Sequence, residues 1–95
     1  MYVRMVIGEA ISPDQIGELR SIFVEEIRLE IGKEDGNIGA NFMVEEGGNM
    51  MIMLTHWTSH ESCLKYHSSR VYRQFVTKTN HLLIGDFVVK LFRME

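Results

Sequence analysis

The sequence has very little cysteine or proline and no long apolar run. Cys63 is the single cysteine, so no disulfide can form within the chain, and the Cys-x-x-Cys spacing of many zinc sites is absent. The N-terminal residues lack the basic start and the apolar core of a signal peptide. No segment approaches the roughly 20 apolar residues that cross a membrane. We therefore expect a reduced, cytoplasmic protein with no membrane partner.

Charge and length restrict the possibilities further. The net charge is -3 at neutral pH and the basic residues form no stripe, which argues against a dedicated nucleic-acid binder. The 95 residues correspond to one domain, residues 1–95. A chain of this size buries only about 60–65% of the surface that its unfolded form exposes, so association with another chain is favourable.

The first third of the chain predicts a strand and a helix. Residues 2–11 alternate with apolar side chains on both faces, which is typical of a strand with protein packed on each side. Arg4 and Glu9 are its polar exceptions, and we interpret them as strand-end charges in solvent. Ser12, Pro13 and Gln15 predict a helix start with a capping box. The helix carries an apolar stripe at spacings of three and four residues: Ile16, Leu19, Phe23, Ile27 and Ile31.

The rest of the chain predicts three strands and a helical region broken in two. Residues 37–46 and 50–57 are strands joined by a glycine-containing hairpin turn. Thr58 and Glu61 form a capping box for a helix over residues 61–67, and Ser68-Ser69 start a second helix. Residues 87–94 form the last strand. The order β-α-β-β-α-β predicts an α+β fold of the ferredoxin-like, split type with a four-stranded antiparallel sheet.

Both faces of the first and third predicted strands are apolar. Helices on one face of such a sheet leave the other face bare, and an exposed apolar surface of this kind usually marks an interaction site. Two sheets packed face to face would bury it. We therefore expect a homodimer.

The junction between strand 50–57 and the next helix is the candidate pocket. Trp57 is either a core indole that seals the junction or a wall that stacks on a flat aromatic ligand. His67 is either a general base with a pKa near the working pH or a helix C-terminal histidine favoured by the helix dipole. Tyr66 and Tyr72 offer phenolic O–H groups and fit core packing equally well.

A group of motifs around Trp57 extends over nearly the whole chain. The motifs are Ser12-Pro13, Gly36-Asn37-Ile38-Gly39, His56-Trp57-Thr58-Ser59-His60-Glu61, His67-Ser68-Ser69 and Val88-Val89-Lys90-Leu91-Phe92. In these motifs the chain resembles the antibiotic biosynthesis monooxygenase family of dimeric α/β barrels. The resemblance implies a homodimer whose two sheets close into a barrel, with a pocket between helices and sheet in each subunit.

The resemblance also implies a chemistry. Several members of the family oxidise phenols, anthrones or quinols with dioxygen and use no flavin, metal or haem. The implied function is a cofactor-independent monooxygenase acting on a small phenolic, quinol or polyketide-like aromatic. By the same resemblance, the catalytic residues would be His67 and Tyr72, and the substrate-binding residues would be Trp57, Tyr66 and Thr55.

The residues of this chain argue against other activities of the family. Haem-degrading relatives carry an asparagine in the first strand and a ligand histidine in the second helical region, where this chain has Ile7 and Val76, so haem degradation is disfavoured. His56, His60 and His81 have no carboxylate or cysteine at ligand spacing, so no metal site is expected. The alternative is a non-catalytic dimeric module that binds a small apolar ligand in the same pocket. A proton acceptor facing that pocket would separate the two functions, and His67 is the candidate.

Overall fold

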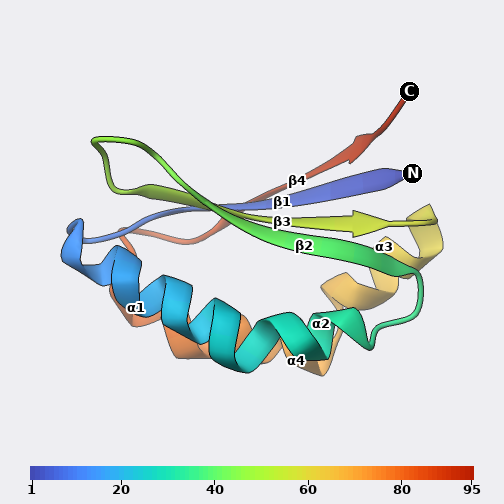
Figure 1. The fold of residues 1–95 in the computed structure, drawn as a ribbon, viewed down its shortest axis with the longest axis horizontal. Coiled ribbons are helices and arrows are strands. Elements are labelled where there is room, and N and C mark those ends of the chain that lie inside the picture. Colours follow the sequence, from blue (N-terminus) through green and yellow to red (C-terminus); the bar gives the residue numbers. More distant parts are fainter.

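The computed structural model describes residues 1–95 and confirms the α+β, ferredoxin-like arrangement (Figure 1). Its strands are β1 (Tyr2–Glu9), β2 (Asn37–Val44), β3 (Met50–Trp57) and β4 (Val88–Arg93). They form one sheet in the order β2-β3-β1-β4, and every neighbouring pair is antiparallel. The two central strands, β1 and β3, are the ones whose sequences are apolar on both faces.

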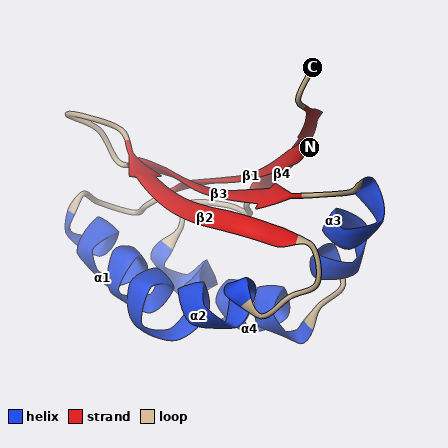
Figure 2. Ribbon diagram, turned by 45° about the vertical axis from the view of Figure 1, so that its right-hand side comes forward, coloured by secondary structure: helices blue, strands red, loops and turns tan.

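All the helices cover one face of the sheet (Figure 2). They are α1 (Asp14–Ile22), α2 (Arg28–Gly32), α3 (His60–His67) and α4 (Arg70–Thr79), and a short 3-10 turn, η2 (Asn80–Leu82), leads toward the last strand. None of them combines the length and apolar character needed to cross a membrane. Strand alternation and register leave the opposite face uncovered and mainly apolar, with these apolar side chains on it: Val3, Met5, Ile7, Ile52, Leu54, Val88 and Phe92. Its polar side chains are Asn41, His56 and Lys90.

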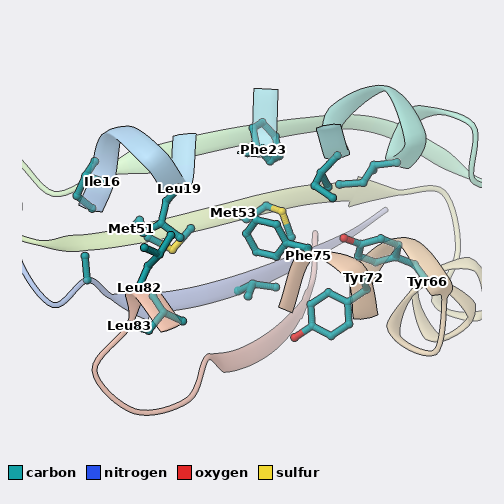
Figure 3. Close-up of a cluster of buried hydrophobic side chains, with 14 of the residues drawn as sticks. Ile16, Leu19, Phe23, Met51, Met53, Tyr66, Tyr72, Phe75, Leu82 and Leu83 are labelled. Atoms are coloured by element: carbon teal, nitrogen blue, oxygen red, sulfur yellow. The ribbon is translucent and has the colours of Figure 1, made fainter. Parts of the chain in front are cut away.

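The core lies between the sheet and the helices. Met51 and Met53 of β3 point to the helix side, where they lie between the apolar stripe of the first helix and Phe75 of α4 (Figure 3). Every residue of the predicted stripe is buried, which confirms that part of the sequence analysis: Ile16, Leu19, Phe23, Ile27 and Ile31.

The first helix is not continuous. A π-helical segment, η1 (Phe23–Ile27), separates α1 from α2. The stripe residues from Leu19 to Ile31 are spaced four residues apart, and four residues advance an α-helix roughly 40° beyond one full turn. The wider π turn compensates for this drift and keeps the stripe against the sheet.

The predicted start of the first helix is only partly correct. Pro13 occupies the cap position, and no side chain accepts a hydrogen bond from the backbone of the first turn. The Ser12 hydroxyl instead donates to the Gln15 side chain. The capping box predicted there is therefore wrong, because its two side chains pair with each other.

The predicted capping box of Thr58 and Glu61 is also wrong. The N-cap of α3 is Ser59, whose Oγ accepts a hydrogen bond of 3.1 Å from the backbone N–H of Ser62. The backbone N–H of Thr58 donates to the carbonyl of Gly36 at 2.9 Å, so Thr58 is still held beside the end of the neighbouring strand. The cap therefore lies one residue later than predicted, and the helix begins at His60.

The second serine cap agrees with the prediction. Ser69 precedes α4, and its Oγ accepts a hydrogen bond of 3.2 Å from the backbone N–H of Tyr72. The chain thus changes direction between α3 and α4, and the Ser69 side chain satisfies one of the backbone N–H groups in the first turn of α4.

The placement of Arg4 in solvent is wrong, whereas Glu9 is exposed as expected. Arg4 is only 2% exposed and lies on the helix side of β1, on the same face as Val6. The alternation of the strand sends its side chain inward, and aromatic rings from the helices enclose it. This buried cation is the centre of the candidate site.

Candidate functional site

A cleft of about 180 Å³ opens between α3 and the paired strands β1 and β4. Arg4 and Leu91 are partners in the β1–β4 register, so both reach the helix side at the same level. A cavity of about 150 Å³ is large enough for a benzene ring, so the cleft has room for one aromatic ring. The lining combines polar side chains with apolar walls: Arg4, Cys63, Leu64, His67, Val89 and Leu91.

The guanidinium of Arg4 is only partly satisfied. Its Nη2 donates a hydrogen bond of 2.7 Å to Nδ1 of His67, whereas Nη1 is buried and has no partner. Its central carbon lies 4.1 Å from the ring centroid of Tyr72 and 5.1 Å from that of Tyr66. Aromatic faces attract cations but do not neutralise them.

No carboxylate forms an ion pair with Arg4. The ion pairs of the chain join partly exposed side chains elsewhere, namely Lys33 with Glu30, Lys78 with Glu26, and Arg93 with Glu95. A buried cation without a counter-charge is costly for a protein to maintain. The cleft therefore carries a positive charge that the chain itself leaves uncompensated.

His67 is the last residue of α3 and lies at the exposed edge of the cleft. Its ring stacks on Tyr72 with the centroids 5.7 Å apart and the planes at 29°. Arginine can only donate hydrogen bonds, so Nδ1 of His67 accepts, and the neutral ring then carries its proton on Nε2. The imidazole thus links the buried cation to the mouth of the cleft.

Tyr66 and Tyr72 enclose Arg4 from the two helices after β3. Both are buried, and their ring centroids are 5.7 Å apart (Figure 3). The Tyr66 hydroxyl has no hydrogen-bond partner in the chain. Burial raises the pKa of Tyr66 above its ordinary value, although the charge of Arg4 acts in the opposite direction. Tyr66 consequently stays protonated, and its O–H remains available as a donor.

Trp57 and Thr55 lie behind this group and do not line the cleft. Trp57 is fully buried, and its indole stacks on Tyr66 with the centroids 4.9 Å apart. Its Nε1 donates to Thr55 Oγ1 at 2.8 Å, and Thr55 in turn donates to the backbone carbonyl of Arg4 at 3.5 Å. The indole N–H is therefore already engaged, and the two side chains support the strand that carries Arg4.

Cys63 is a cleft residue to which the sequence analysis gave no function. It is buried on the cleft side of α3, and burial raises the pKa of its thiol while the charge of Arg4 acts to lower it. The raised pKa keeps the thiol protonated near neutral pH, which makes it a small, weakly polar part of the lining.

The structure brings together part of the predicted site and adds to it. The side chain of Arg4 is surrounded by Tyr66, His67 and Tyr72, which lie close together in the sequence. The sequence analysis, however, placed Arg4 in solvent. Strand alternation was the signal that could have placed Arg4 correctly, because it shares a face with the buried Val6. The apolar walls Val89 and Leu91 come from the last strand, whose pairing with β1 local sequence does not specify.

The remaining histidines do not join the site. His56 belongs to the uncovered face of the sheet, and His60 and His81 are exposed. His60 packs against Tyr2 with ring centroids 5.5 Å apart. No group of three or more His, Cys, Asp or Glu side chains is arranged to hold a metal ion.

Comparisons with known proteins agree with this architecture. The family model described as antibiotic biosynthesis monooxygenase matches residues 2–78. A search of curated proteins finds no match.

Several solved structures share the fold. A monooxygenase from the gene ActVA-Orf6 of Streptomyces coelicolor, solved in complex with the ligand nanaomycin D, is 13% identical with a TM-score of 0.86, and the match covers 99% of this chain and 87% of that one. A conserved protein from Methanosarcina mazei Go1 is 19% identical with a TM-score of 0.81, covering 100% and 94%. A mutant of SnoaB, a cofactor-independent oxygenase from Streptomyces nogalater, is 16% identical with a TM-score of 0.77, covering 98% and 92%. At these identities the likeness is one of fold.

Proposed function

Because the chain belongs to the antibiotic biosynthesis monooxygenase family, we propose that it is a cofactor-independent monooxygenase that oxidises a small phenolic, quinol or polyketide-like aromatic with dioxygen. Two structural neighbours support the proposal, a cofactor-independent oxygenase and a monooxygenase in complex with nanaomycin D. The observation that carries it is the pairing of Arg4 with His67 at one end of a cleft with otherwise apolar walls. Such walls suit a flat ring, and the polar end suits its hydroxyl group.

The reaction needs only the substrate and dioxygen. The phenolic O–H ionises, and the anion transfers one electron to dioxygen, which gives a substrate radical and superoxide. A new C–O bond joins the two as a hydroperoxide. The O–O bond then breaks, the proton on the same ring carbon leaves, and the second oxygen atom departs as water. A phenol and dioxygen thus give a quinone and water.

The residues of the site assist each stage by stabilising charge. Arg4 holds the negative charge of the ionised substrate and of superoxide, since a buried cation that is already fixed in position acts without reorganising. His67, at the mouth, contacts the reacting hydroxyl and shares its proton, and Tyr72 orients the ring. Tyr66 adds a hydroxyl, and Trp57 and Thr55 fix the position of Tyr66 and Arg4 from behind.

A homodimer in the cytoplasm is part of this proposal. The uncovered apolar face of the sheet supports it, because two such faces pack as aligned layers about 10 Å apart. The single, buried cysteine is compatible with a reducing compartment.

Oxygen uptake tests the proposed function. We expect purified protein to consume one dioxygen per quinone formed with at least one member of a panel of phenols, quinols, naphthols and anthrones. His67→Ala should lower kcat at least about 10-fold, whereas His60→Ala, an exposed histidine of the same helix, should leave it unchanged. Equal uptake by wild type and His67→Ala would remove His67 from the mechanism.

The second candidate is a dimeric module that binds a small aromatic or apolar ligand without reaction. It is favoured by one observation, the hydrogen bond from Arg4 that already occupies Nδ1 of His67. This candidate predicts no oxygen uptake across the panel, together with ligand-dependent quenching of Trp57 fluorescence.

A further inference from the structure

We propose that Arg4 is the ligand-recognition residue of the cleft, and that it binds the aromatic as an oxyanion while fixing His67 as a hydrogen-bond donor toward it. This inference concerns the same cleft as the proposed monooxygenase and deepens that proposal. It makes Arg4 the residue that selects the ionised form of the ligand. It also replaces the proton sharing proposed above for His67 with donation of a hydrogen bond to the ligand.

The first step is the uncompensated charge. The guanidinium is 2% exposed, its Nη1 has no partner, and it belongs to a residue that lines the cleft. The side chains around it include no carboxylate: they are Cys63, Tyr66 and His67 on α3, Tyr72 on α4, and apolar side chains on β4. The charge of Glu34 acts on Tyr66, but Glu34 forms no ion pair with Arg4. An oxygen anion in the cleft would supply the missing counter-charge.

The second step is the direction of the Arg4–His67 hydrogen bond. Because Nδ1 accepts from Nη2, a proton can be added to His67 only at Nδ1, where it would displace Arg4 and place two cations side by side. The neutral ring presents its N–H at Nε2. His67 is therefore built to donate to a ligand rather than to remove a proton from it.

The third step is the donor inventory of the site. Among the polar side chains that line the cleft, Arg4 has donors only and His67 offers Nε2–H. A lining with these two donors favours a ligand that brings acceptors. The proton released by an ionising phenol passes to solvent, because Leu64, Val89 and Leu91 at the cleft are all more than one-third exposed.

The test measures the ionisation of bound 4-nitrophenol, whose phenolate absorbs at longer wavelength than the phenol, in the absence of oxygen. In wild type we expect the pKa of the bound probe to lie at least one unit below that of the free probe, the usual effect of an adjacent arginine on an acid. The same cycle requires the phenolate to bind about 10-fold or more tightly than the phenol. The probe 4-nitroanisole has the same ring without an ionisable O–H, and it should bind at least about 10-fold more weakly than the phenolate.

Variants separate the two roles. Arg4→Gln should abolish the shift, and Arg20→Gln, an exposed arginine of α1, should leave it unchanged. His67→Gln retains an oxygen that accepts from Arg4 and an N–H that donates to the ligand, so it should keep most of the shift and of kcat. His67→Ala should lose both. If Arg4→Gln does not fold, the comparison of the two probes in wild type still decides the question.

Two results would overturn the inference: an unshifted or raised pKa of bound 4-nitrophenol, or equal affinity for 4-nitroanisole. His67→Gln as inactive as His67→Ala would identify His67 as a general base and refute its role as a donor. The two proposals can fail separately. Oxygen uptake without a lowered pKa of bound 4-nitrophenol would support the monooxygenase and refute the role of Arg4. A lowered pKa without oxygen uptake by any substrate would support an anion-binding module and refute the monooxygenase.

Discussion

The indole N–H of Trp57 donates to the hydroxyl of Thr55 at 2.8 Å, two residues earlier on the same face of β3. Trp57→Phe keeps a ring but loses this bond, so we expect the free energy of unfolding to fall by about 1–3 kcal/mol. Thr55→Val removes the same bond from the other side. In urea denaturation the double variant should therefore lose less than the two single variants together, and strictly additive losses would show that the bond contributes little.

Arg4→Met should change stability in the direction opposite to most core substitutions. The change removes a buried charge that has no counter-ion and keeps an unbranched side chain of similar reach. We expect the free energy of unfolding to stay level or rise by about 1–3 kcal/mol, as when buried ions are replaced by apolar residues. Arg20→Met on the exposed face of α1 is the control and should stay within about 0.5 kcal/mol of wild type. A clear destabilisation by Arg4→Met would make Arg4 a structural residue.

Stability should fall at alkaline pH because of Tyr66. Burial raises the pKa of its phenol in the folded state above its ordinary value of about 10. The folded state thus holds the proton more tightly, so this contribution is complete below pH 10 and is lost as the pH rises above it. The expected slope is on the order of 1 kcal/mol per pH unit. Denaturant titrations at several pH values should show a flatter profile for Tyr66→Phe, and parallel profiles would contradict the prediction.

The cap of α3 gives a matched pair of variants. Ser59→Ala removes the acceptor for the Ser62 N–H and should cost about 0.5–2 kcal/mol. Thr58→Ala changes the neighbouring hydroxyl, which caps nothing, and should cost no more than about 0.5 kcal/mol. Thermal unfolding of the two proteins checks the order, and a reversal would restore Thr58 as the cap.

The homodimer is tested by placing charge on the uncovered face. Wild type should sediment at twice the chain mass of 11.0 kDa, and Leu54→Lys in the middle of β3 should give the monomer. Leu29→Lys on α2 is the control, because Leu29 is 74% exposed on the helix side and should not affect assembly. Wild type that sediments at 11.0 kDa at micromolar concentration would refute the homodimer.

The parts of the fold that depend on local periodicity could be predicted from the sequence. The order of helices and strands was predicted, and all five residues of the apolar stripe of the first helix were identified. The buried face of β3 was not predicted, because both of its faces are apolar. Within the candidate site, His67, Tyr66 and Tyr72 could be grouped because they lie on two short, consecutive helices.

The environment of Arg4 could not be predicted in this way. Its hydrogen-bond partner, His67, is 63 residues further along the chain, and only the complete fold brings the two together. The choice between Thr58 and Ser59 as a cap was equally inaccessible, because both are good caps. A backbone hydrogen bond from Thr58 to the distant Gly36 accompanies the observed choice.

The π segment between α1 and α2 makes the first helix one residue longer than its apolar pattern needs. Deleting Val24, which is 43% exposed, would change the spacing of the stripe from 3, 4, 4, 4 to 3, 4, 3, 4, the regular repeat of an amphipathic α-helix. The chain should therefore accept a one-residue deletion at this point while both flanking turns keep their contacts with the sheet.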